Sequence, residues 1–549
     1  MRGLMMDRPL LISSVMAYGA RYHGAAEIVS RSVEGPIHRY SYAESYRRMQ
    51  KLAHALIALG AEPGDRIGTL AWNTYRHFEL YYAVSGIGAV CHTINPRLFH
   101  DQIIQIINHA EDRFLFVDLT FVPLLEEIRD ELHSVEKIVV LTDRAHMPET
   151  ALSEALCYEE LIADHPDSFD WPEFDENTAA GLCYTSGTTG EPKGALYSHR
   201  STVIHALCTI VVNDGRWTTS RDSFLIIVPM FHVCAWGIPY ACPLSGAKIV
   251  LPGPRYDGEA LYELLESEAV TVSAGVPTIW RTLLDYLRQT GRKLTHLERL
   301  CCGGAAPPLA MIRELEEVHG IDFMQGWGMT ETSPVGAVTA LRPEQKALGR
   351  EARYAIKKKA GRAPFTFDLK IVDGEGNRLP HDGKTSGELL ARGPYIMSAY
   401  YNNEAANETA FDAEGWFRTG DVATIDPDGY LQITDRTKDL IKSGGEWISS
   451  IDLENAVMAH PGVAEAAAIA RPHPKWGERP LLVVVAAPGA AGGAAPGKDE
   501  ILGFLSDKVA RWWLPDDVVF VEELPHTATG KVSKTKLRER FKDHELPTV

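Results

Sequence analysis

The stretch YTSGTTGEPKG, residues 184 to 194, holds three glycines, three threonines, one serine and one lysine. The apolar run before it, AAGLCY at 179 to 184, predicts a buried strand, and the segment from Ser198 onward has the periodicity of a helix. We therefore expect the glycine-rich loop to lie between a strand and a helix. The apolar positions of that helix are expected to share one stripe, which holds Val203, Ile204, Leu207, Ile210 and Val211.

The composition of this loop suits a polyphosphate. Glycines let backbone N–H groups converge on an anion without a Cβ in the way, and Lys193 adds a positive charge. Lys193 is preceded by Pro192 and followed by Gly194, so the loop lacks the GK[ST] ending of nucleoside triphosphatase P-loops. The alternative is a surface loop that is rich in turn-forming residues. Further hydroxyl donors are Thr185, Ser186, Thr188 and Thr189.

Composition places the chain among soluble globular proteins of several structural units. It has 549 residues, of which 45% are hydrophobic and 23% charged. The 55 Lys and Arg against 73 Asp and Glu give 55 − 73 = −18, so nucleic acid and anionic membranes are not expected as partners. An anionic substrate would need a focused cationic site.

The cysteines and the N-terminus indicate a reducing compartment. The eight cysteines form no CxxC pair and no zinc-ligand spacing, so they predict buried thiols. No apolar run is long enough for a transmembrane segment, and Asp7, Arg8 and Pro9 interrupt the short apolar start of the chain. We expect a cytoplasmic protein. Its oligomeric state is open, with a homodimer as one option.

Three patterns follow one another along the chain. Helical and strand-like segments alternate to about residue 340, which predicts α/β layers with largely parallel sheet. Residues 365 to 433 are short strands joined by turns, which predicts a β-rich subdomain. The chain after Asp435 predicts a compact α+β domain, with a low-complexity loop at 487 to 497. We expect an N-terminal domain over 1–436 and a C-terminal domain over 437–549.

YTSGTTGEPKG resembles the phosphate-loop signature of the adenylate-forming superfamily, which includes acyl-CoA synthetases, nonribosomal peptide adenylation domains and luciferase. The other motifs of that superfamily follow in order along nearly the whole chain. The sequences of these motifs are most similar to those of bacterial medium-chain fatty acid–CoA ligases, and methylmercaptopropionate–CoA ligases are closely related enzymes. The motifs are PMFHV at 229–233, GGAAPP at 303–308, GWGMTE at 326–331, WFRTGD at 416–421, DRTKDLIKSGGEWIS at 435–449 and TATGKVSK at 527–534.

The resemblance implies a two-step reaction. A carboxylic acid attacks the α-phosphate of ATP and gives acyl-AMP and pyrophosphate, and the thiol of coenzyme A then displaces AMP. The first step gathers several negative charges in one place, so the site needs cations and hydrogen-bond donors. A small mobile C-terminal domain is implied, which turns between the two steps about a hinge at Lys438.

The resemblance also assigns residues to ATP and AMP. Thr330 would donate to the α-phosphate, Glu331 would hold Mg²⁺, Trp327 would lie on the adenine, and Asp421 would accept the ribose hydroxyls. Taken alone, a Thr-Glu pair is typical of a helix cap. The full set for the nucleotide is Thr185, Ser186, Gly187, Thr188, Thr189, Gly190, Lys193, Gly304, Ala305, Ala306, Gly326, Trp327, Gly328, Met329, Thr330, Asp421, Arg436 and Lys531.

Lys531 is the strongest catalytic candidate, because a cation between the carboxylate and the α-phosphate favours their crowded transition state. Thr330, Glu331 and His232 are the other catalytic candidates, although a lone histidine among apolar residues is usually a core residue. The path of CoA is expected along Lys442, Gly444, Gly445, Glu446 and Trp447. The acyl pocket is expected to hold His232, Trp236, Gly304, Met329, Pro334 and Val335.

Several alternatives stay open at this point. The chain could be a ligase of methylmercaptopropionate or another short-chain acid, or an adenylation enzyme that loads a carrier protein. A nucleotide-binding sensor descended from such an enzyme would be expected to have lost Lys531, Glu331 or the loop, all of which are present. A luciferase-like monooxygenase would share the motifs. The run KKK at 357 to 359 could meet a CoA phosphate, but a solvated run of charges is the commoner case.

Overall fold

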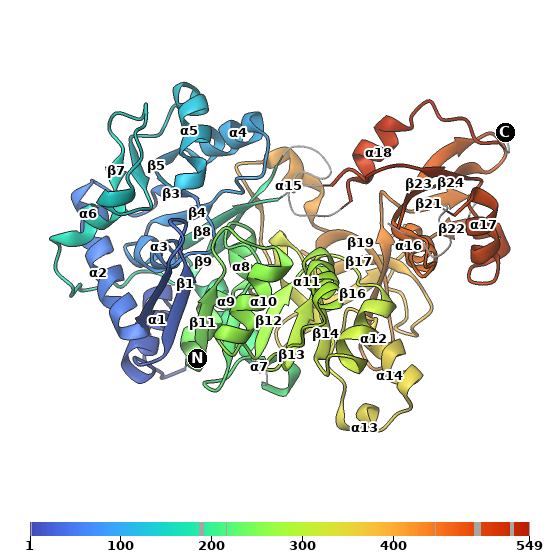
Figure 1. Cartoon of the computed structure of the whole chain (residues 1–549), viewed down its shortest axis with the longest axis horizontal. Coiled ribbons are helices and arrows are strands. Elements are labelled where there is room, and N and C mark those ends of the chain that lie inside the picture. The colour runs from blue at the N-terminus through green and yellow to red at the C-terminus, as the bar shows by residue number, and fades with distance from the viewer. Residues whose placement is uncertain are drawn as a thin grey trace.

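The strands in the described part of the chain form four sheets that are covered by helices (Figure 1). Figure 1 shows an elongated molecule in which the N-terminal part, in blue, and the C-terminal part, in red, lie at opposite ends. Within the described residues, no helix has the length and apolar character that crossing a membrane requires. Of residues 213–215 only the backbone is described. The computed structural model describes residues 1, 3–185, 192–215, 217–444, 446–487, 496–526 and 532–547.

The first sheet has eight strands, and its inner pairs are all parallel while the two edge strands pair antiparallel. Parallel neighbours need a crossover connection, which accounts for the alternation of strands and helices in the sequence. In spatial order the strands are β15 (Val335–Val338), β14 (Asp322–Gly328), β13 (Arg299–Cys302), β12 (Val272–Gly275), β10 (Ser223–Ile226), β11 (Lys248–Leu251), β1 (Glu27–Arg31) and β2 (Ile37–Ser41).

The second sheet also has eight strands and ends on a short strand from far along the chain. In spatial order the strands are β18 (Tyr400–Tyr401), β9 (Gly194–Ser198), β8 (Ala179–Tyr184), β4 (Val90–Thr93), β3 (Arg66–Leu70), β5 (Asp112–Val117), β6 (Lys137–Val140) and β7 (Leu156–Cys157).

Two smaller sheets follow. The third is antiparallel and confirms the predicted β-rich region, with the order β16 (Asp368–Val372), β17 (Gly387–Arg392), β19 (Phe417–Ile425), β20 (Leu431–Arg436). The fourth has the order β22 (Glu446–Ile448), β21 (Ile441–Ser443), β24 (Gly477–Ala486), β23 (Val463–His473), with β25 (Asp517–Phe520) beside β24. The α/β class is confirmed, and the division of the chain at 436 and 437 stays a prediction.

Helices cover these sheets. Those around the first two sheets are α1 (Ile12–Tyr22), α2 (Tyr42–Ala58), α3 (Tyr75–Gly86), α4 (His100–Ala110), α5 (Val122–Ile128), α6 (Tyr158–Ala163), α7 (His199–Gly215), α8 (Val233–Trp236), α9 (Ile238–Ser245), α10 (Gly258–Ser267), α11 (Pro277–Thr290), α12 (Leu309–Glu317), α13 (Pro343–Lys346) and α14 (Arg350–Lys357). Those farther along are α15 (Glu404–Ala410), α16 (Ser450–Met458), α17 (Lys498–Ser506) and α18 (Lys534–Arg540).

Helix α3 forms the centre of the α/β part. All 12 of its residues are buried, as expected of a helix that packs on every side. The Tyr82 hydroxyl donates to the carbonyl of Pro239 at 2.8 Å, and Arg76 donates to the carbonyl of Leu141 at 2.9 Å. Pro239 lies in α9, which packs on the first sheet, and Leu141 follows β6 of the second sheet. The helix therefore joins the two sheets.

The glycine-rich loop corrects one prediction. Its residues 186–191 lie outside the described part of the chain, but the flanking segments are clear. Strand β8 before it pairs antiparallel with β9 after it, from Ala179–Ser198 to Tyr184–Gly194, and α7 starts only at His199. The loop thus joins two strands, because GALYS pairs with AAGLCY along its whole length.

The predicted stripe of α7 is wrong in part. Val203 is buried, but Leu207 is 46% exposed and Val211 is 57% exposed. The helix buries Ala206 and Thr209 in place of those larger residues. Apolar residues of α7 occur on all sides of the helix, so hydrophobicity alone did not identify the face that packs against the rest of the protein.

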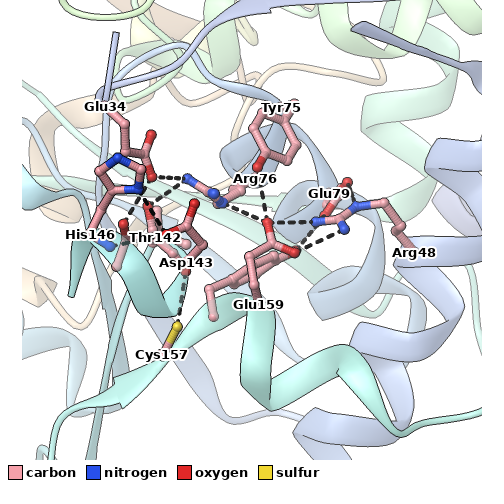
Figure 2. A network of polar contacts seen from close by, with 12 residues as sticks. Glu34, Arg48, Tyr75, Arg76, Glu79, Thr142, Asp143, His146, Cys157 and Glu159 are labelled. Atoms are coloured by element: carbon pink, nitrogen blue, oxygen red, sulfur yellow. Dashed lines mark hydrogen bonds and ion pairs between the residues drawn. The ribbon is translucent and has the colours of Figure 1, made fainter. Parts of the chain in front are cut away.

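A buried network of charges joins α2, α3 and α6 to the turn between β1 and β2 (Figure 2). Arg48 contacts Glu79 at 2.7 Å and Glu159 at 2.9 Å. Arg76 contacts the same Glu159 at 2.8 Å and Glu34 at 2.7 Å. Burial raises the pKa of the Glu79 carboxyl, and the nearby Arg48 guanidinium opposes that shift. Each of these carboxylates is thus paired with an arginine, whose positive charge offsets the cost of burying the carboxylate.

We predict that Arg48→Met lowers the free energy of unfolding by about 3–5 kcal/mol, because Glu79 would stay buried without its cation. Urea unfolding followed by tryptophan fluorescence measures this. Arg313→Met is the matched control, since Arg313 pairs with an exposed Glu351, and it should cost at most about 1 kcal/mol. Equal losses in the two variants would contradict the role of the network.

Candidate active site

A cavity of about 480 Å³ lies where three of the four sheets meet. Thr185 and Lys193 reach it from the two ends of the β8–β9 loop. Thr330 and Glu331 reach it from the turn after β14, and Arg436 reaches it from the end of β20. Motifs that lie up to 250 residues apart in the sequence are thereby brought to one place.

Most of the residues predicted for the nucleotide, the acyl group and the hinge line this cavity. They are Thr185, Lys193, His232, Trp236, Gly304, Gly326, Trp327, Gly328, Met329, Thr330, Glu331, Pro334, Val335, Arg436 and Lys438. Other predicted residues lie outside the described part of the chain: Ser186, Gly187, Thr188, Thr189, Gly190, Gly445 and Lys531.

Asp421 lies behind this lining and connects two sheets. The indole N–H of Trp327 donates to one carboxylate oxygen of Asp421 at 2.8 Å, and the Arg436 guanidinium lies 3.3 Å from the other. Asp421 is 5% exposed. Because an ionised carboxylate has about four acceptor sites, these two partners leave capacity for further donors such as ribose hydroxyls.

Glu331 lies in a tight turn, Thr330–Thr332, and is almost wholly buried. Its Oε1 accepts a hydrogen bond of 2.8 Å from the hydroxyl of Tyr400. Burial raises the pKa of the Glu331 carboxyl, and the Tyr400 hydrogen bond acts in the opposite direction. The carboxylate is therefore held in place while its charge remains poorly solvated.

Tyr400 is a residue of this site that the sequence did not indicate. It lies on β18, the strand that pairs with β9 at the edge of the second sheet. The ammonium group of Lys193 lies 4.9 Å from the centre of its ring, within the range of a cation–π contact. Tyr400 thus connects the cation of the glycine-rich loop with Glu331. No motif surrounds it, so only the strand pairing brings it here.

A magnesium ion fits this arrangement only if it arrives with phosphates. Within the described ranges, no group of three or more His, Cys, Asp or Glu side chains could hold a metal. Mg²⁺ commonly takes one or two carboxylates and completes its shell with substrate phosphates and water. Glu331 supplies one such carboxylate at the cavity wall.

The lining is strongly cationic although the whole chain is acidic. Among the described lining residues, five are Lys or Arg and one is acidic, Glu331. Arg97, which the sequence did not indicate, lies among three aromatic rings, with its guanidinium 5.6 to 5.9 Å from their centres. The five cations are Arg97, Lys193, Arg418, Arg436 and Lys438.

The segment of the cavity wall that follows His232 has an unusual backbone conformation. The next four residues, Val233 to Trp236, all have positive φ between 47° and 58°, and Gly237 continues this left-handed turn at 73°. Such a conformation costs roughly 1–2 kcal/mol for each non-glycine residue. It is found where packing determines it, often at functional sites. Here the turn directs Trp236 into the cavity.

Trp236 lies directly against Gly303. A methyl group added at Gly303 would come within 2.8 Å of the indole. The cavity has further apolar lining, which includes residues of α7 and α9 and which we call its deep branch. The residues of this deep branch include Val212, Trp217, Ile227, Ile238 and Cys301.

The described residues among those predicted for the CoA path do not line the cavity. In the described part of the chain, Lys442, Gly444, Glu446 and Trp447 line neither this cavity nor a second one of about 290 Å³. They form the β21–β22 hairpin, where Trp447 is 48% exposed. Gly304 and Lys438 line both cavities, and Ala305 and Ala306 line the second.

The run at 357 to 359 is not the solvated run of charges that was expected. The Lys357 ammonium is buried and lies 2.8 Å from Asp322. Lys359 pairs with Asp426 at 2.6 Å. Two of the three lysines are therefore structural, since other segments of the chain supply carboxylate partners that the local sequence does not reveal.

We predict that Gly303→Ala lowers the free energy of unfolding by about 1–3 kcal/mol, because the methyl group must displace the Trp236 ring. Urea unfolding measures the loss. Gly503→Ala is the control: Gly503 lies on α17 with open space around it, so alanine should be neutral or stabilising by up to about 1 kcal/mol.

A double-mutant cycle separates this contact from other effects. Adding Trp236→Phe should recover part of the loss, because the smaller ring leaves room for the methyl group. Strictly additive losses would show that the two residues do not compete for space.

Comparison with known proteins agrees with this geometry. The AMP-binding enzyme family matches residues 17–401, and the AMP-binding enzyme C-terminal domain matches residues 452–531. The 3-methylmercaptopropionyl-CoA ligase of Ruegeria lacuscaerulensis is 51% identical over 543 residues, which are 99% of each chain. The medium-chain-fatty-acid–CoA ligase of Ectopseudomonas oleovorans is 46% identical over 99% of this chain and 98% of its own.

The solved structures show the same fold. The anthranilate CoA ligase AuaEII in complex with anthranoyl-AMP has a TM-score of 0.84 at 24% identity, over 97% of this chain and 98% of its own. The Mycobacterium tuberculosis fatty acyl CoA synthetase has a TM-score of 0.72 at 27% identity, over 97% and 99%. The chain belongs to the family of AMP-binding enzymes.

Proposed function

We propose that this chain, an ATP-dependent acyl-CoA ligase by its family and its relatives, prefers medium-chain fatty acids. The observation that carries the preference is the apolar part of the cavity lining, the deep branch, which includes Val212 of α7 and Ile238 of α9 in addition to Trp236. A hydrocarbon chain would gain about 0.8 kcal/mol for each CH₂ that this branch buries.

In the first half-reaction, an oxygen of the carboxylate attacks the α-phosphorus of ATP and pyrophosphate leaves. We propose that Lys193 and the glycine-rich loop hold the phosphates and that Thr330 donates to the α-phosphate. Asp421 and Arg436 would hold the ribose beside Trp327. The cationic lining supports these roles, because the two reacting anions repel each other.

Glu331 would hold the magnesium ion that accompanies ATP, and the ion would withdraw charge from the phosphate oxygens. Its hydrogen bond with Tyr400 fixes the orientation of the carboxylate before substrate arrives. Lys531 would stand between the carboxylate and the α-phosphate, a role that rests on the TATGKVSK motif.

In the second half-reaction, the thiol of CoA attacks the acyl carbonyl and AMP leaves with the carboxylate oxygen. We propose that residues 437–549 turn about Lys438 between the two halves, and that the β21–β22 hairpin then flanks the CoA path. The described residues of this hairpin line neither cavity, which supports such a turn. The eight buried thiols support a cytoplasmic location.

A short thioether acid is a second candidate substrate. Two relatives are 3-methylmercaptopropionyl-CoA ligases of Ruegeria, at 51% and 49% identity. Such an acid would occupy the cavity in front of Trp236 and leave the deep branch unfilled.

A panel of carboxylates tests the substrate. Acids from three to sixteen carbons and 3-(methylthio)propionate are supplied with ATP and CoA, and AMP release is followed. We expect the highest kcat/KM near eight to ten carbons, and Trp236→Ala should move the optimum to longer chains because it opens the deep branch. A maximum for 3-(methylthio)propionate that Trp236→Ala does not move would overturn the medium-chain proposal.

We predict that Glu331→Gln lowers acyl-AMP formation by about 10²-fold or more, because it removes the charge that binds the metal. Pyrophosphate exchange measures this step. The folded pKa of Glu331 is raised, so the carboxyl stabilises the fold only at low pH and costs stability at neutral pH. The variant should therefore unfold no more easily than the wild type at pH 7.

Tyr400→Phe is a milder variant that tests the same carboxylate, Glu331. It keeps the charge and loses only the hydrogen bond, so a smaller loss of roughly tenfold is expected. A Glu331→Gln enzyme with near-normal exchange would refute the metal role.

A further inference from the structure

An ion pair joins the C-terminal part of the chain to the large α/β part, outside the cavity described above. The Arg281 guanidinium on α11 donates to the carbonyl of Ala464 at 3.1 Å and to Oε1 of Glu465 at 3.1 Å. Ala464 and Glu465 lie on β23 of the fourth sheet. The contact therefore links two parts of the chain that are expected to turn relative to each other.

The backbone of β23 is shaped for this contact. The register of β23 on β24 shifts between Val463 and Glu465, so that Ala464 falls outside the paired positions. A bulge of this kind releases a carbonyl from the ladder and re-aims the neighbouring side chain. Arg281 engages both acceptors at once, which a planar guanidinium does better than an ammonium group.

The second oxygen of Glu465 faces another group of the C-terminal part. The His526 imidazole Nε2 lies 3.5 Å from Oε2 of Glu465. His526 in turn forms a β-bridge with Val532. Arg281, Glu465 and His526 all line the second cavity, of about 290 Å³, which also includes Gly304 beside the nucleotide cavity. The pair thus lines a cavity that shares Gly304 with the nucleotide cavity.

The contact holds one orientation of the C-terminal part. In that orientation the second cavity opens beside Gly304, and the described residues of the β21–β22 hairpin line neither cavity. The orientation therefore suits the half-reaction that does not use CoA.

We propose that Arg281 and Glu465 are positioning residues for adenylation: their ion pair stabilises the orientation used by the first half-reaction and must break before CoA reacts. This inference rests on the proposed function and on its turn about Lys438. The pair is a modest one, because the two side chains are 39% and 23% exposed. An exposed pair shifts a population by up to about fivefold, which is weak enough to break at every turnover.

The experiment measures the two half-reactions separately in the full chain. Pyrophosphate exchange reports adenylation, and consumption of CoA with synthetic acyl-AMP reports the second half. The variants are Arg281→Glu, Glu465→Arg and the double exchange of both. Arg288→Glu is the matched control, since Arg288 lies on the same helix but pairs with Glu314 of α12 within the α/β part.

We expect each single charge reversal to lower the ratio of the first rate to the second by about threefold to fivefold. The double exchange should restore the ratio, and Arg288→Glu should leave it unchanged. A loss confined to stability would lower both rates together and would not be recovered by the exchange.

Three results would overturn the proposal. The first is an unchanged ratio in both single variants, and the second is a fall that the double exchange does not restore. The third is an equal change in Arg288→Glu. In all three the wild type still makes acyl-CoA, so only the positioning role is lost. A wild type without acid-dependent pyrophosphate exchange would remove the proposed function and this inference with it.

Discussion

The constraint on which the structure depends is the mutual repulsion of a carboxylate and a triphosphate. The chain carries a net charge of −18, which by itself repels both substrates. Among the described residues that line the cavity, five are Lys or Arg and one is acidic, Glu331. In a partly enclosed site such charges act more strongly than they do in water. The catalytic design is thus a local reversal of the charge of the whole molecule.

Three sheets have to meet for this reversal to occur. Helix α3 joins the first two sheets, and the charged network around Arg48 fixes its surroundings. Tyr400 connects the second sheet to Glu331, which follows strand β14 of the first sheet. Asp421 connects the third sheet to Trp327 of the first. The cations are therefore held by the connections between sheets and not by any single loop.

The sequence predicted the α/β class, the β-rich region and fifteen of the residues that line the cavity, because long motifs identify the family and with it a set of residues that the fold brings together. It missed features that arise from pairing between distant segments. Tyr400 and Arg97 stand in no motif, and β9 pairs with β8 although the segment was expected to lead into a helix. Lys357 forms ion pairs with Glu316 and Asp322, and the sequence around Lys357 cannot indicate these distant partners. The bulge at Ala464 that receives Arg281 is likewise a property of the folded sheet.

If this cavity joins a carboxylate to the α-phosphate of ATP, one oxygen of the carboxylate must end in AMP. Transfer of a carboxylate oxygen from the fatty acid to AMP is the most direct test of this reaction. The enzyme is supplied with ATP, CoA and a fatty acid labelled with ¹⁸O in both carboxylate oxygens, and the products are analysed by mass spectrometry. The account predicts one labelled oxygen in AMP and none in pyrophosphate. Label in inorganic phosphate together with ADP, or AMP without label, would contradict it.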